Sequence, residues 1–494
     1  MTKLTIFLVL IGLLTACAQV PEYVRPELPV PPQWPESPVG AGDTPLQSMN
    51  VTQRDSWRAF FLDANLQTII AAALEHNRDL AIAVYRVEEA RAQAGIAKSA
   101  YLPELDLNAQ HEARGTSTNV ARSSFSTTSQ RYDVGIAMPA FELDFWGRLQ
   151  SLDDAARANF LATEYARNAF RLSLIRDVAQ SWFSVRELSQ RKGLAAQTVS
   201  GREASLKLTT RRRDVGLASD IDFQTTTGAL ANARVELASL ARQLAAAENG
   251  LRLLVGADVP VEHGVSPSAT TRSESFTRPP CSAVVCEAVV SSAPTGANNG
   301  LVRSIAAGLP ATVLLDRPDI LAAEQKLIAA NANIGAARAS FLPKISLTAA
   351  AGTASSALSN LFSAGGGTWS FVPALTIPLF DAGRNQDNLD IAQARKNIAV
   401  AEYEKAIQTA FRDVANLLAA RTHYVAQIEA LQSSVQAQSE RLRLIEARYA
   451  GGVANHLELL DARRDSFAAQ QNLLSAQQQA LSTSASLFAA LGGN

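Results

Sequence analysis

The chain has 494 residues, of which 47% are apolar and only 6% are aromatic, and its formal net charge at pH 7 is -1. A small aromatic share with abundant Ala, Gln and Leu favours long packed helices over a conventional mixed core. Lys and Arg are spread along the chain without a basic stripe, so no nucleic-acid partner is expected. The five histidines lack ligand spacing, and no nucleophile or phosphate-binding motif is present, so no catalytic residue, metal or cofactor is predicted.

The N-terminus has the pattern of an export signal. Lys3 precedes an apolar run from Leu4 to Leu14, which is too short to span a bilayer and suits a signal-peptide core. The small residues just before Cys17 resemble a bacterial lipobox. That resemblance implies a lipoprotein signal peptide at 1–16, cleavage before Cys17 and a covalent lipid on this cysteine. The alternative is an ordinary signal peptide followed by an incidental cysteine.

Two cysteines remain, Cys281 and Cys286. An exported chain meets an oxidising periplasm, where a disulfide between them can form and persist. Two free thiols are the competing interpretation. A metal site is disfavoured, because no second pair of ligands accompanies them.

Proline clusters and hydrophobic periodicity predict the elements in chain order. Residues 17–55 are rich in proline and predict an extended tether behind the lipid. From Leu66 to Ala100 the apolar residues recur at helical spacing, which predicts one helix that ends before Pro103. Alternating polar and apolar residues then predict a β-hairpin within 104–140, and a second one within 343–380.

A long stretch without proline follows each predicted hairpin. A helix of ~65 residues would be ~100 Å long at ~1.5 Å per residue, which no ordinary globular domain needs. Glycines interrupt both stretches near their middle, where they allow a turn. The sequence therefore predicts two long helical hairpins with tips near 216–220 and 451–456.

The two halves of the chain repeat the same landmarks in the same order. Tyr101-Leu102-Pro103 corresponds to Phe341-Leu342-Pro343, and Gly216 corresponds to Gly452 at an offset of 236 residues. Such repetition indicates an internal duplication. We predict a first structural repeat at 56–256, an equatorial linking region at 257–315 and a second repeat at 316–494.

Four strands of about ten residues match the length of a tilted transmembrane strand. Four strands cannot close a barrel, and an open edge in lipid leaves backbone groups unpaired at several kcal/mol each. Several chains must therefore share one barrel if these strands cross a membrane. The alternative is a soluble sheet covered by helices, which the export signal and the helix lengths disfavour.

Several motifs point to one family. They are Pro21 to Pro26, Trp57 to Leu80, Asp316 to Ile320, Phe341 to Ile345 and Leu457 to Arg463. With these motifs the chain resembles the TolC-like outer membrane factor family, in the lipoprotein branch that serves multidrug efflux by RND-type systems. The resemblance covers nearly the whole mature chain. It implies a mixed α/β membrane protein, a homotrimer whose twelve-stranded transmembrane β-barrel takes four strands from each chain and continues into a long periplasmic α-helical barrel.

The resemblance also implies a function. The chain would be the lipid-anchored outer-membrane channel of a tripartite efflux system and a passive conduit for drugs or other small molecules. Its partners would be a periplasmic adaptor protein, an inner-membrane RND-type pump and outer-membrane lipid. The alternatives are a periplasmic lipoprotein scaffold of coiled coils, or an outer-membrane channel for protein secretion or metal export.

The family pattern places a periplasmic gate at the hairpin tips. Glu458 and Asp461 are three residues apart and therefore expected on one helix face, so that three chains would form acidic rings that favour cations. The alternative is a pair of solvated surface charges. His456 is either a pH-sensitive group or simply an exposed side chain. The residues expected to contact the adaptor are Gly216, Leu217, Ala218, Ser219, Gly452, Val453, Ala454 and Asn455.

Overall fold

A computed structural model of the chain describes residues 20–34, 56–116, 127–257, 301–302 and 310–493. The described residues fall into two compact units. The first unit takes its residues from 20–28, 84–166 and 319–406, and the second from 29–83, 167–318 and 407–493. Each unit therefore draws on both halves of the sequence. None of the described helices combines the length and the apolar character that a bilayer crossing requires.

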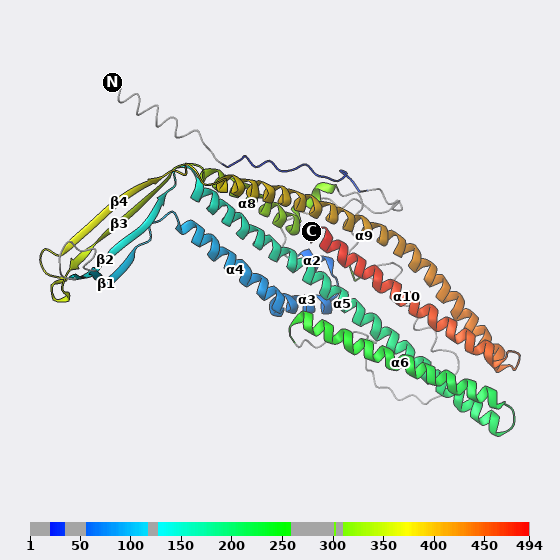
Figure 1. The fold of residues 1–494 in the computed structure, drawn as a ribbon. Coiled ribbons are helices and arrows are strands. Elements are labelled where there is room, and N and C mark those ends of the chain that lie inside the picture. Colours follow the sequence, from blue (N-terminus) through cyan, green and yellow to red (C-terminus); the bar gives the residue numbers. More distant parts are fainter. Residues whose placement is uncertain (1–19, 35–55, 117–126, 258–300, 303–309, 494) are drawn as a thin grey trace. The chain divides into compact units, whose positions relative to one another are not determined.

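In the first unit four antiparallel strands form one sheet in the order β1-β2-β3-β4 (Figure 1). The strands are β1 (Asp106–Thr116), β2 (Thr127–Leu143), β3 (Lys344–Ser355) and β4 (Gly367–Thr376). Each hairpin comes from one half of the sequence, and the pairing of β2 with β3 joins the halves. Strand β2 continues past residue 140, the predicted end of this hairpin. After a bulge between Met138 and Phe141 it pairs with β3 again.

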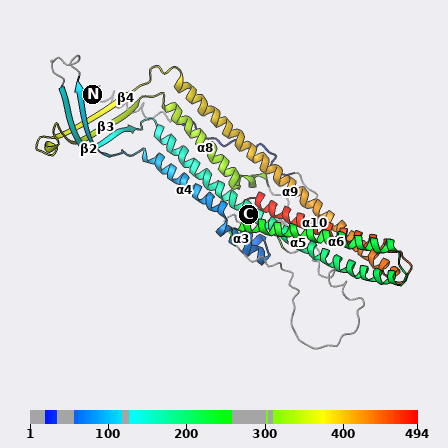
Figure 2. The same cartoon turned by 60° about the horizontal axis from the view of Figure 1, so that its bottom comes forward.

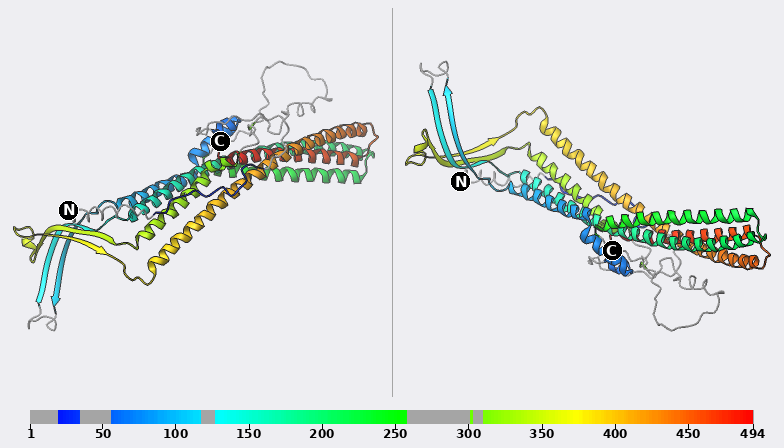
Figure 3. Two further views of the ribbon diagram at one scale, coloured as in Figure 1. Left: turned by 90° about the horizontal axis from the view of Figure 1, so that it is seen from above. Right: turned by 90° about the horizontal axis from the view of Figure 1, so that it is seen from below.

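The junction between β2 and β3 contains two facing glycines, Gly135 and Gly352, which are partners in the ladder. Pairing of these strands stops at Tyr132 and Ser355, and Figure 3 shows the two hairpins diverging beyond that point. Every residue of β4 is exposed. Among the described residues, β1 and β4 each have one edge without a partner strand. Such edges require strands from further chains when the sheet lies in lipid.

A repeated turn connects each hairpin to its long helix, α5 (Arg148–Asp214) or α9 (Arg384–Ala450). The Asp144 carboxylate accepts hydrogen bonds from the N–H groups of Arg148 at 2.7 Å and Gln150 at 2.9 Å. Asp381 accepts in the same way from the N–H of Asn385 at 2.9 Å. These carboxylates cap the free N–H groups of the first helical turn. An aspartate therefore caps the start of the long helix after each hairpin.

The other helices of the first unit include α8 (Pro318–Ala339) and most of α4 (Arg78–Ser99). A small cluster of buried alanines packs α8 against the start of α5. Its members are Ala155, Ala158, Ala329 and Ala332. Side chains of this size let the two helix backbones approach closely, and the spacing of three residues keeps each pair on one face.

The single helix predicted from Leu66 to Ala100 is wrong. Two helices, α3 (Ala64–His76) and α4, meet at Asn77, whose backbone is extended with ψ 127°. The Asn77 amide nitrogen Nδ2 donates to the Leu254 carbonyl oxygen at 2.7 Å, and its oxygen accepts from the Leu80 N–H at 2.8 Å. The break is therefore made by a contact with the distant helix α6 (Asp220–Val255), which local periodicity does not reveal.

The second unit holds the tip-side parts of the two helical hairpins, from residue 167 of the first and residue 407 of the second, and these parts run side by side (Figure 2). One consists of α5 and α6, and the other of α9 and α10 (His456–Ala490). The short helix α2 (Ser56–Phe60) and α3 pack on them through an aromatic core in which Phe60 stacks on Phe488 with ring centroids 4.7 Å apart. Phe61 is fully buried in the same core, which contributes about 1.5–3 kcal/mol. The linking region contributes a 3-10 helix, η1 (Ala311–Asp316).

Candidate gate at the helical hairpin tips

The first tip is a tight turn between α5 and α6. Gly216 has φ +76°, a left-handed conformation that favours glycine. The N–H of Leu217 donates back to the Arg212 carbonyl at 2.7 Å, which closes α5. Ser219 then caps α6 through a reciprocal pair of hydrogen bonds with Asp222. The hydroxyl and N–H of Ser219 also lower the pKa of the Asp222 carboxyl, so Asp222 stays ionised at the start of the helix.

The second tip repeats this construction. Gly452 has φ +74°, and the N–H of Val453 donates to the Arg448 carbonyl at 2.9 Å. The Asn455 side chain accepts from the N–H of Glu458 at 2.7 Å and caps α10. The two glycines that the sequence indicated as turn residues thus occupy equivalent positions in the two hairpins.

Most residues expected to meet an adaptor are open to solvent in the protomer. Leu217 and Val453 are 78% and 73% exposed. No atom lies within 4 Å of the position that a Cβ would take at Gly216 or Gly452. Ala454 differs, because it is buried within the protomer and is not available to a partner in this arrangement.

The two tips contact each other through aromatic and basic side chains. The Arg212 guanidinium lies 5.4 Å from the centre of the Tyr449 ring and donates to its hydroxyl at 3.2 Å. The Tyr449 ring in turn lies 5.8 Å from the His456 ring. This contact ties α5 to α9 and α10, and a guanidinium over an aromatic face contributes about 0.5–1 kcal/mol at an exposed site.

His456 is half-buried, which disagrees with the interpretation as a freely exposed side chain. Its pKa lies below its ordinary value of 6.5, first because burial disfavours the charged ring. Asp222 opposes this effect, whereas the guanidinium groups of Arg202, Arg463 and Arg212 add to it. The ring therefore stays neutral at a mildly acid pH where an ordinary histidine is charged, which argues against a switch at that pH.

Acidification is expected to destabilise the second tip through His456. Below pH 6.5 the His456 ring binds a proton in the unfolded tip, whereas in the folded tip its lowered pKa keeps it neutral. Protonation therefore favours the unfolded tip, and the stability of the folded tip falls as the pH drops. Amide exchange in the first turn of α10, corrected for the intrinsic pH dependence, should accelerate between pH 7.5 and 5.5. His456→Gln should remove most of this dependence. An unchanged pH profile in that variant would assign the effect to other groups.

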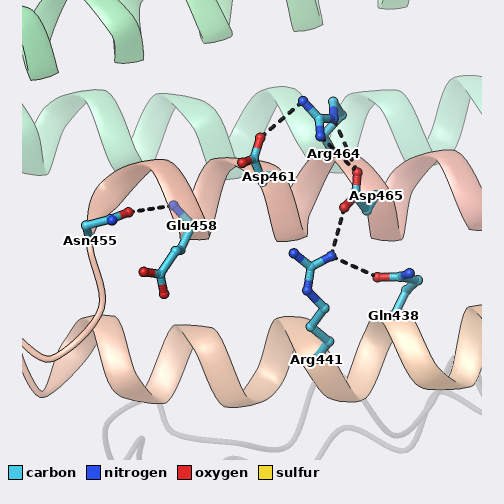
Figure 4. A network of polar contacts seen from close by, with 7 residues as sticks. All are labelled: Gln438, Arg441, Asn455, Glu458, Asp461, Arg464 and Asp465. Atoms are coloured by element: carbon cyan, nitrogen blue, oxygen red, sulfur yellow. Dashed lines mark hydrogen bonds and ion pairs between the residues drawn. The ribbon is translucent and has the colours of Figure 1, made fainter.

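The two acidic residues predicted to form gate rings lie on α10 just past the second tip. Figure 4 shows Glu458 directed toward α9, whereas Asp461 is directed to another side of the helix, where it meets Arg464. The spacing of three residues therefore does not give one common acidic face in the protomer. The Asp461 carboxylate lies 3.1 Å from the Arg464 guanidinium, so it is an ion-pair partner rather than an isolated charge.

Arg464 extends this ion pair into a network between α9 and α10. It also lies 3.2 Å from Asp465, and Asp465 accepts from Arg441 of α9 at 2.8 Å (Figure 4). The Arg441 guanidinium, with a further contribution from Arg464, lowers the pKa of Asp465. These arginines are not among the site residues predicted from the sequence, although Arg464 stands three residues after Asp461 and so lies next to it on the helix surface.

Arg202 of α5 was also missed, and it is 8% exposed. Its Nη1 atom is buried without a hydrogen-bond partner among the described residues. Burial lowers the pKa of the Arg202 guanidinium, and the nearby positive charge of Arg463 lowers it further. The tip region is thus richer in basic groups than the predicted acidic rings suggested. Cys17, Cys281 and Cys286 lie outside the described residues.

Comparison with known proteins shows which family shares this architecture. The family model described as "Outer membrane efflux protein" matches residues 69–257 and 309–493. The toluene efflux pump outer membrane protein TtgF of Pseudomonas putida is 38% identical over 483 residues, which cover 97% of this chain and 94% of that protein. The cation efflux system protein CusC of Escherichia coli O6:H1 is 37% identical over 482 residues, which cover 97% and 96%.

A solved structure gives the same result. The open state of the Neisseria gonorrhoeae MtrE outer membrane channel superposes with a TM-score of 0.78 at 33% identity and covers 96% of this chain and 98% of that one. These similarities confirm the predicted fold class, a trimeric outer-membrane channel in which a β-barrel of four strands per chain continues into a periplasmic helical barrel. The chain belongs to the outer membrane efflux protein family.

Proposed function

We propose that this efflux channel works as a passive conduit between a periplasmic adaptor with its RND-type inner-membrane pump and the cell exterior. The observation that carries the proposal is the joining of an open four-stranded sheet to two long helical hairpins whose tips pack together. Three chains supply twelve strands, which close a barrel and leave no edge unpaired in lipid.

The first test is the mass of the unheated protein in detergent, corrected for bound detergent. A mass near three protomers that forms conducting pores in a planar bilayer supports the conduit. A stable monomer without conductance would favour the lipoprotein scaffold instead.

The cargo is proposed to be chosen by the pump and not by the channel. Two relatives of nearly equal identity to this chain, TtgF and CusC, are named for toluene and for cation efflux. The degree of sequence identity to this chain therefore does not indicate which cargo a relative exports. The described residues contain no group of three or more His, Cys, Asp or Glu side chains that would hold a metal ion. We propose drugs or other small organic molecules as the cargo.

The N-terminal cysteine is proposed to anchor the channel in the outer membrane. Cys17 follows a signal-peptide pattern and precedes the extended segment that starts the described structure. Two or more acyl chains on one residue give stable anchoring, since each buried methylene contributes ~0.8 kcal/mol. Mass spectrometry of the mature N-terminal peptide tests this, and the same digest reports whether Cys281 and Cys286 form a disulfide.

Asp461 is proposed as the gate carboxylate that favours cations, with Glu458 in a lesser role. Asp461→Asn leaves Arg464 paired only with Asp465 and makes the tip more positive. The ratio of cation to anion permeability should fall roughly 5-fold, since one charge pair at ~4 Å in a watery pore is worth about 1 kcal/mol. Reversal potentials across a salt gradient measure this ratio.

Glu440→Gln is the matched control for the Asp461 variant. It removes one carboxylate per chain from an exposed ion pair with Arg443 on α9. The permeability ratio should stay near that of the unmodified channel. An equal fall in both variants would mean that net charge, and not a ring at Asp461, sets the selectivity.

A further inference from the structure

The contact between α5 and α10 contains a buried charge. The two helices run antiparallel, and Gln180 of α5 donates to Ser486 of α10 at 2.8 Å. Closer to the tips, Arg463 of α10 donates to Ser205 of α5 at 2.7 Å. Arg202 stands three residues before Ser205, on the same side of α5, and is 8% exposed. Its side chain therefore belongs to the packed contact between the helices and not to the surface of the hairpin.

Arg202 has no counter-ion among the described residues. Its Nη1 atom is buried there and makes no hydrogen bond. Two carboxylates of this region have other partners. Glu203, the next residue, pairs with Arg234 of α6 at 2.8 Å. Glu446 of α9 pairs with Arg463 at 2.9 Å. Because a guanidinium keeps its proton at neutral pH, a positive charge remains buried without compensation, which is costly.

Further positive charges lie close to Arg202. The charge of Arg463 is near enough to act on Arg202, and both act together with Arg212 on His456. Like charges in a buried place repel each other strongly, because little water screens them. A water molecule accepts a hydrogen bond from Nη1 but leaves this repulsion in place. An anion satisfies the donor and also offsets the charge.

A buried hydroxyl stands level with the unpaired guanidinium. The contact between Ser205 and Arg463 sets the register of the two antiparallel helices. Three residues further from the tips on each helix, Arg202 of α5 and Ser466 of α10 stand level. Ser466 is 3% exposed, and its oxygen accepts from Gln470 at 3.4 Å. Its hydroxyl proton has no acceptor among the residues that the structure describes, so it is free to donate to an anion between the helices.

We propose that Arg202 and Ser466, with the charge of Arg463 beside them, bind one small inorganic anion, such as chloride or phosphate, between α5 and α10. The anion accepts hydrogen bonds from Arg202 Nη1 and from the Ser466 hydroxyl, and the first of these is charge-assisted. Its charge offsets the repulsion between the two guanidinium groups. The bound anion thereby fastens the first helical hairpin to the second behind the tips. Each protomer has its own site, since both helices belong to one chain.

Hydrogen exchange of the purified full-length trimer tests the site. Sodium chloride, sodium phosphate and sodium gluconate are compared at one ionic strength and one pH, and gluconate is the control because it is too large for a buried site. The amides of residues 202–209 and 463–470 lie inside α5 and α10, so their exchange reports local opening. An anion that binds only the closed form should slow this exchange about tenfold at roughly nine times its Kd. Equal exchange in all three salts would overturn the proposal.

Arg202→Met separates the site from a general effect of salt. The variant lacks the buried charge, so chloride and phosphate should no longer slow exchange relative to gluconate. In gluconate it should exchange no faster than the wild type, because the uncompensated charge is gone. Arg234→Met breaks the exposed pair with Glu203 and is the matched control, which should keep the full anion effect. An anion effect of wild-type size in Arg202→Met would assign the slowing to other positions and overturn the site.

Diffraction gives a test that needs no variant. Crystals of the wild-type trimer grown in bromide or in phosphate should show an anomalous peak or tetrahedral density within hydrogen-bonding reach of Arg202 Nη1. Water-sized density without anomalous signal in both crystals would contradict an anion at this position.

Discussion

Gly352→Val is expected to abolish assembly of the trimer. A Cβ at residue 352 would lie 2.5 Å from the Gly135 Cα and would also meet the Val134 carbonyl. These are backbone atoms of the paired strand, so no side chain can turn aside to make room. A Cβ on Gly135 would likewise lie 2.7 Å from the Ala351 carbonyl oxygen. The two glycines therefore let β2 and β3 approach closely, and this strand pair joins the two hairpins of the sheet.

Separation of β2 from β3 would leave two isolated hairpins. Each would present a new unpaired edge to lipid, at several kcal/mol for each unsatisfied backbone group. The measurement is the heat-sensitive trimer band and the amount of protein in the outer-membrane fraction, both of which should fall to background. Gly115→Val is the matched control, because it lies in β1 and has nothing within 4 Å of its added Cβ. Normal trimer levels in Gly352→Val would refute the steric argument.

The sequence predicted the elements whose patterns are local. Alternation of polar and apolar residues predicted all four strands, and the absence of proline predicted the long helices α5 and α9. Gly216 and Gly452 predicted the turns, because few other residues adopt positive φ without strain. These signals depend only on neighbours along the chain, so they survive without knowledge of the packing.

Features that depend on distant contacts were not predictable in this way. The break at Asn77 depends on the Leu254 carbonyl, which lies 177 residues away. The Arg25–Glu324 pair joins residues 299 apart. The ion pair of Asp461 was missed for another reason. Glu458 and Arg464 both lie three residues from Asp461, so the spacing alone does not say which of them it contacts. Asp461 pairs with Arg464 because their charges are opposite.

Gly216→Arg and Gly452→Arg are expected to abolish efflux while the trimer still forms. Both glycines have φ near +75°, where another residue costs about 1–2 kcal/mol. Neither position has an atom within 4 Å of an added Cβ, so the protomer itself does not resist the change. The exposed side chains of Leu217 and Val453 flank these glycines and suit contact with a partner helix. A bulky charge beside them would keep that helix away.

Asparagine at the same positions separates backbone strain from the loss of contact. Asn adopts the left-handed conformation more readily than Arg and adds little bulk, so Gly216→Asn and Gly452→Asn should retain most drug resistance. Gly365→Arg tests the same strain in the β3–β4 loop, where φ is +100° and the space is also open. Minimum inhibitory concentrations should fall to those of a channel-deletion strain only for the two tip arginines. Wild-type resistance in those variants, with normal trimer levels, would remove the tips from the adaptor contact.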